Sequence, residues 1–128
     1  MANSTTIYRS NSNHNSVVVT ENKTLAAADC GITQAVSTDA ITITLPSTAV
    51  GLRYRIENHG SANGSCAVTI SPAAADKIVG AALTAADNKD IINTKATAKA
   101  DIDFIELVAD GTDGWYVHDY AGTWSREA

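Results

Sequence analysis

The chain has 128 residues and a mass of 13.3 kDa, which leaves room for one domain with its own hydrophobic core. Its composition, 45% hydrophobic and 18% charged, excludes a disordered protein, but aromatic residues are only 5%, so aliphatic side chains must build most of the core. A formal net charge of −5 argues against nucleic acid or an anionic membrane as a direct partner, because binding either requires concentrated Lys and Arg.

Residues 1–16 are dominated by Asn and Ser, and their sizeable apolar side chains beyond Met1 are Ile7 and Tyr8. Such a composition cannot bury enough apolar surface to order itself. Two interpretations stay open: a frayed terminus, or an arm that orders on a neighbouring subunit with Ile7, Tyr8 and Arg9 as its anchor. Because no apolar segment resembles a secretory signal or a membrane span, we expect synthesis in the cytoplasm and no membrane partner.

From Ser16 onward, short β-type runs alternate with turn residues, a pattern typical of all-β domains. The clearest run is 41–45, in which apolar and hydroxyl side chains alternate until Pro46 ends it. Two Ala-rich stretches, 25–29 and 72–77, are too short for stable helices and predict turns or single helical turns. In chain order, we expect strands at 17–20, 41–45, 52–57, 68–71, 91–92, 103–108 and 115–118.

The last two of these strands predict a hairpin, because the loop between them contains two Asp-Gly pairs that supply positive-φ positions. The whole pattern predicts one all-β domain, an antiparallel β-sandwich or jelly-roll-like barrel with an extended N-terminal arm. Its expected boundaries are 1–16 for the arm, 17–120 for the β-domain and 121–128 for a C-terminal tail.

Sequence motifs that would indicate catalysis or metal binding are weak. The sequence has no Gly-x-Ser-x-Gly elbow and no Cys/His signature, and its three histidines fall in unrelated contexts, so we do not expect an enzyme. The Asp-rich segments 87–90 and 110–114 could offer oxygen ligands to a hard cation, but turn chemistry is the better interpretation, and no metal or cofactor is expected. Cys30 and Cys66 lack Cys-x-x-Cys spacing and are interpreted as buried free thiols, with a disulfide or a reactive site as the alternatives.

Aromatic residues are distributed unevenly, since four of the seven fall within the last fourteen residues. Trp115 shares a strand face with Val117, which predicts a core position. Trp124 lies beyond the regular strand pattern and requires cover, either from its own domain or from another subunit. Tyr116, Tyr120 and Trp124 are therefore the candidate residues for an interface with a subunit or another partner.

Several segments together resemble a pattern of small tailed-phage virion proteins. They are a Thr-Leu-Pro strand (42–46), a Gly-x-x-Tyr-x-Ile strand (51–56), an Ile-x-Pro segment followed by Asp-x-Ile-x-Gly (68–80), and an Asp-Gly-x-x-x-Trp-x-Val hairpin (110–117). Because almost no chain remains outside the module, it looks most like a capsid decoration (cement) protein. The resemblance implies a homotrimer that binds the major capsid protein on the capsid exterior and stabilises the shell. The alternative is a receptor- or glycan-binding module of a head or tail fibre.

Overall fold

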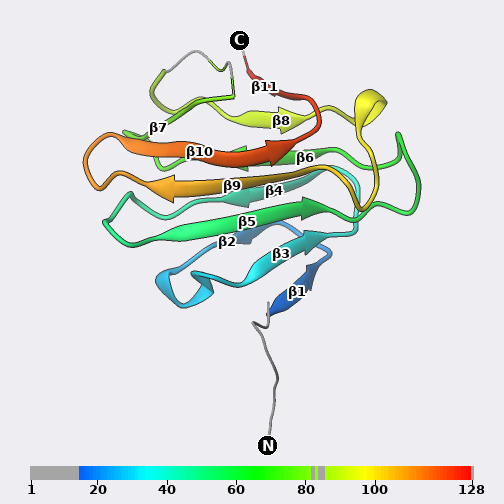
Figure 1. Cartoon of the computed structure of the whole chain (residues 1–128), viewed down its shortest axis with the longest axis horizontal. Helices are drawn as coiled ribbons and strands as arrows, with labels where there is room; N and C mark the ends of the chain where they lie inside the picture. The colour runs from blue at the N-terminus through cyan, green and yellow to red at the C-terminus, as the bar shows by residue number, and fades with distance from the viewer. Residues whose placement is uncertain (1–14, 82, 84–85, 128) are drawn as a thin grey trace, which may run out of the picture.

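The computed structural model describes residues 15–81, 83 and 86–127, and they form a sandwich of two β-sheets (Figure 1). In spatial order, the six-stranded sheet contains β1 (Ser16–Val19), β3 (Thr33–Val36), β5 (Arg53–Asn58), β9 (Phe104–Ala109), β10 (Gly114–Ala121) and β7 (Lys77–Val79). The five-stranded sheet contains β11 (Trp124–Arg126), β8 (Ile91–Asn93), β6 (Val68–Ser71), β4 (Ile41–Thr44) and β2 (Lys23–Thr24). The all-β sandwich is thus confirmed, and neither sheet closes into a barrel.

The first six strands wind as a coil that alternates between the two sheets. β1, β3 and β5 are parallel neighbours in one sheet, and β2 and β4, then β4 and β6, are parallel neighbours in the other. The expectation of antiparallel sheets is therefore wrong for this half of the chain. Each connection crosses to the opposite sheet instead of returning beside the strand it leaves, so consecutive strands cannot form hairpins.

The second half supplies the antiparallel pairs. β9 lies between β5 and β10 and is antiparallel to both, and β8 is likewise antiparallel to β6 and β11. The predicted hairpin is confirmed as β9–β10. At its turn the Asp110 carboxylate accepts hydrogen bonds from the backbone N–H groups of Thr112, Asp113 and Gly114, which is the turn chemistry expected of this segment.

All seven predicted strands are present, with small shifts in their ends, but β2, β3, β7 and β11 were not predicted. β3 was not predicted because all four of its residues are buried, so its sequence lacks the polar-apolar alternation of a half-exposed strand. Segment 121–128, expected to be a tail, contains the end of β10 and all of β11, which pairs with β8. The predicted arm residues Ile7, Tyr8 and Arg9 lie outside the described residues.

The helical content of the described residues is two short 3-10 turns, η1 (Ala27–Asp29) and η2 (Lys95–Thr97). The first confirms the single helical turn expected at 25–29. No helix among these residues has the length and apolarity needed to cross a membrane.

Aliphatic side chains from both sheets fill the space between them, together with two tryptophans. Trp115 is buried as predicted, with its ring 5.5 Å from that of Tyr54. Trp124 is also buried, at 7% exposure, and its indole N–H donates to the Ala121 carbonyl. Its own domain therefore covers Trp124. Cys30 and Cys66 are free thiols, as predicted, but only Cys66 is buried and Cys30 is half-buried. Burial raises the pKa of Cys66.

A polar chain of three side chains joins the two sheets within this core. The Asn58 amide donates to Asn93 Oδ1 at 2.7 Å, and the Asn93 amide donates in turn to Asp103 Oδ2 at 2.9 Å. All three residues are almost fully buried, and the Asp103 Oδ1 atom has no hydrogen-bond partner among the described residues. Since buried polar groups are costly when unpaired, these bonds constrain how the sheets meet.

Candidate functional site

The six-stranded sheet presents one surface to the exterior, which we term the outer face. It arises from strand alternation, because β5 and β9 direct every second side chain inward, such as Tyr54, Ile56 and Leu107. The residues between them point outward. The outer face is defined here by Thr33, Arg53, Arg55, Glu57, Phe104, Glu106, Val108 and Tyr116.

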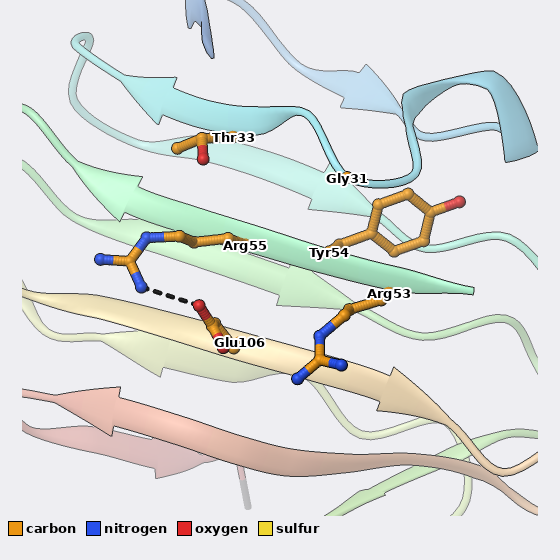
Figure 2. Close-up of a pocket in the computed structure, with 6 residues that line it drawn as sticks. All are labelled: Gly31, Thr33, Arg53, Tyr54, Arg55 and Glu106. Atoms are coloured by element: carbon orange, nitrogen blue, oxygen red, sulfur yellow. Dashed lines mark hydrogen bonds and ion pairs between the residues drawn. The ribbon is translucent and has the colours of Figure 1, made fainter. Parts of the chain in front are cut away.

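Arg55 occupies the middle of the outer face and is held from three sides. Its Nε donates to Glu57 Oε2 at 2.6 Å, and its Nη1 donates to Glu106 Oε2 at 2.9 Å on the adjacent strand (Figure 2). The guanidinium carbon also lies 3.8 Å from the centroid of the Phe104 ring. Two carboxylates and an aromatic face therefore fix this cation, and pairing with the two glutamates raises the pKa of Arg55 against the opposing effect of burial.

Glu57 links Arg55 to a histidine at the end of the same strand. Its second carboxylate oxygen lies 2.7 Å from His59 Nε2, and His59 Nδ1 lies 2.9 Å from a carboxylate oxygen of Asp101. Burial acts to raise the pKa of Glu57, but hydrogen bonds from Arg55 and His59 outweigh it and hold the pKa below the ordinary value. A continuous set of polar contacts therefore runs from Glu106 through Arg55 and Glu57 to His59 and Asp101.

Two adjoining depressions lie over this network. One has a volume of about 210 Å³, and its lining includes Gly31, Thr33, Arg53 and Glu106 (Figure 2). The other, of about 430 Å³, is lined by Thr33, Arg55, Glu57 and Glu106. Both have the short Thr33 side chain at β3, and the longer charged side chains stand on β5 and β9. The outer face is therefore hollowed where these strands meet.

A row of three outward-facing residues begins at Arg53, which lines the first depression. Arg53 is paired in register with Val108, and Val108 with Tyr116, so these three residues form a row across β5, β9 and β10. Tyr116 is 42% exposed, and Arg53 is exposed as well. Tyrosine and arginine next to an apolar side chain are the residue types that carry most binding energy in protein interfaces.

The three predicted interface residues do not form one surface. A register shift between Val117 and Asp119 inserts one extra residue into β10. Tyr116 therefore pairs with the outward-facing Val108, whereas Tyr120 pairs with Ile105, whose side chain faces the interior. Tyr120, at 44% exposure, thus lies on the opposite side of the strand, and Trp124 is covered.

The charged part of the outer face was not predicted as a site. The alternation in 52–57 indicates that Arg53, Arg55 and Glu57 face outward, but Glu106 is 51 positions from Arg55 in the chain. No spacing in the sequence predicts the contact between Arg55 and Glu106, because it forms only through the pairing of β5 with β9. Within the described residues, no group of three or more His, Cys, Asp or Glu side chains could hold a metal ion.

Acidification is expected to lower the free energy of unfolding of the protein, because Glu57 then takes up a proton. Its folded-state pKa lies below the ordinary value of 4.5, so the unfolded chain binds a proton more readily. The stabilising contribution is complete above about pH 4.5 and is lost as the pH falls through the folded-state value. Urea unfolding between pH 7 and pH 3 measures this loss, and Glu57→Gln should reduce its slope. A slope in Glu57→Gln equal to that of the parent would contradict the assignment.

No protein-family model matches this sequence, and no curated protein matches it.

Proposed function

We propose that the protein is a structural virion protein that binds the outer surface of a phage capsid as a trimer and stabilises the shell. We infer the surface that contacts the capsid from the row of Arg53, Val108 and Tyr116 on the outer face. The row combines an exposed cation, an aliphatic side chain and an exposed aromatic ring on three adjacent strands. Such a combination suits a protein partner, here the major capsid protein.

The rest of the outer face supports the same proposal. Arg55 is held by Glu57, Glu106 and Phe104, so few side-chain rotations remain to be lost when a partner covers it. A rigid face loses less entropy on binding than a flexible one. In a trimer three such faces would engage together, and their combined avidity would allow each contact to be weak.

The proposal is tested by measuring how variants occupy purified phage shells. Tyr116→Ala should lower the affinity for the shell by about tenfold or more per site, because the contact loses a half-exposed aromatic side chain. Tyr120→Ala is the matched control, since Tyr120 has nearly the same exposure but lies on the other side of β10. Equal affinity of both variants and the parent for the shell would overturn the assignment of the outer face.

The mass of the native protein, measured by light scattering, tests the trimer separately. A species of about three times 13.3 kDa supports it. A strict monomer at micromolar concentration, both free and on shells, would overturn it.

A second candidate is the receptor- or glycan-binding module of a head or tail fibre. The specific observation in its favour is that charged side chains line the depressions of the outer face and that the exposed Tyr116 ring lies on the same face, since sugars stack on aromatic rings and bond to charged groups. Glycan-array binding that disappears in Tyr116→Ala and persists in Tyr120→Ala would favour this function over capsid decoration.

A further inference from the structure

Among the described residues of the outer face, Arg53 is a cation without a partner. Its side chain is exposed, and within this part of the chain it makes no ion pair, hydrogen bond or contact with an aromatic ring. Arg55, two residues along β5, is held by two carboxylates and a ring. Figure 2 shows both arginines and the bond from Arg55 to Glu106. A guanidinium has five N–H donors, so those of Arg53 are open to a molecule from outside.

The carboxylates of the outer face are already used by other side chains. Glu57 accepts a hydrogen bond from Arg55 with one oxygen, and its other oxygen lies 2.7 Å from His59 Nε2. Glu106, which lines the same depression as Arg53, accepts a hydrogen bond from Arg55 at 2.9 Å. A carboxylate that pairs with Arg53 without breaking these contacts has to come from another molecule.

The surroundings of Arg53 favour a carboxylate over a neutral group. Val108 is paired with Arg53 in the next strand, and Tyr116 follows in the strand after it. A partner that covers these two side chains also removes water from the neighbouring guanidinium, and a cation that loses water requires a charged partner. Arginine binds a carboxylate through two parallel N–H bonds, which also fixes the direction of approach.

The charge of the whole protein indicates that this recognition is local. The chain has a formal net charge of −5, so an acidic partner is repelled at long range. At physiological ionic strength this repulsion is screened beyond about 8 Å, whereas a partly buried contact pair is screened much less. A single carboxylate against Arg53 is therefore compatible with the acidic protein, but a broad acidic surface is not.

We propose that the partner segment that meets the outer face carries one aspartate or glutamate, whose carboxylate pairs with Arg53, next to apolar side chains that cover Val108. The inference rests on the proposed capsid function, because it states the chemistry that the major capsid protein presents to this face. Arg53 then selects which protein surface is accepted, and Tyr116 contributes contact area.

The affinity of full-length variants for purified phage shells tests the ion pair. Arg53→Gln removes the charge and should lower the affinity per site by about tenfold, and Arg53→Lys, which keeps the charge without the planar fork, should lower it less. Arg126→Gln is the matched control, because it removes the same charge from β11 in the opposite sheet, and it should bind as the parent does. Equal affinities of Arg53→Gln and Arg126→Gln would overturn the proposal.

Chemical modification of the shell tests the carboxylate itself. Treatment with a carbodiimide and methylamine converts the exposed carboxylates of the shell into neutral amides before the protein is added. It should lower the affinity of the parent by the same factor as Arg53→Gln does, and should leave the affinity of Arg53→Gln unchanged. Equal losses of affinity for the parent and for Arg53→Gln would contradict the pairing.

The outcomes separate this inference from the proposed function. If Tyr116→Ala weakens shell binding and Arg53→Gln does not, the acidic partner is wrong and the capsid function stands. If the parent does not occupy shells at all, the capsid function fails and the inference fails with it. Arg53-dependent binding of a sialylated glycan, without shell binding, would assign the carboxylate to a sugar and overturn the protein partner.

Discussion

Replacing Gly114 with alanine is expected to destabilise the protein by about 3 kcal/mol or more, because the new methyl group has no space. Gly114 begins β10 and pairs with Lys77 of β7, and a Cβ at this position would overlap the Lys77 carbonyl oxygen. Its φ of 147° adds strain for any residue with a side chain. Relief requires separation of β7 from β10, which are parallel neighbours. Urea unfolding at neutral pH measures the effect.

Gly51→Ala is the matched control for this prediction. Gly51 also has a positive φ, 95°, but no atom lies within 4 Å of the Cβ that would be added. This variant should therefore lose only the backbone preference of glycine, about 1 kcal/mol. A similar loss in Gly51→Ala and Gly114→Ala would show that backbone strain alone, and not the contact with Lys77, sets the cost.

Removing the Asn93 side chain is expected to cost about 3 kcal/mol, because Asn93 is the middle of the buried polar chain. Asn93→Ala deletes the acceptor of the Asn58 amide and the donor to Asp103, together with a 3.1 Å bond to the Thr123 carbonyl. The Asn58 and Asp103 groups stay buried and each loses a partner, which is more costly than losing a bond at the surface. Chemical denaturation monitored by tryptophan fluorescence gives the change in unfolding free energy.

The control for this variant is Asn63→Ala. Asn63 is exposed, and its side chain accepts one hydrogen bond, from the Ala100 backbone N–H at 2.9 Å. Its loss should cost less than about 1 kcal/mol because water replaces the missing partner. If Asn93→Ala were no more destabilised than Asn63→Ala, the polar chain would not contribute to holding the two sheets together.

Both substitutions concern contacts that position the outer face. Gly114 joins β10, which carries Tyr116, to the edge strand β7, and the polar chain joins β5 to the opposite sheet through Asn58 and Asn93. Since a binding surface requires rigid support, variants at either position are expected to impair partner binding indirectly. Binding measurements on them must therefore be corrected for the fraction of folded protein.

The candidate site was only partly predictable from the sequence. The alternation of 52–57 was sufficient to predict that Arg53 and Arg55 point outward. The same rule, applied to the strand of Trp115, predicted that this side chain points inward. Grouping Tyr120 with Tyr116 did not follow from that rule, and an extra residue in β10 places the two side chains on opposite sides of the strand. A bulge depends on how two strands pair, and a local pattern does not contain that information.

By itself the sequence determined the local structure: the all-β class, seven of the strands and the β9–β10 hairpin, because hydrophobic alternation and Asp-Gly turns act over a few residues. The tertiary structure decided which strands are neighbours. The parallel coil, the contact of Arg55 with Glu106 and the burial of Trp124 each join residues distant in the chain. Pairing between distant strands depends on the packing of the whole core, so short-range patterns could not specify it.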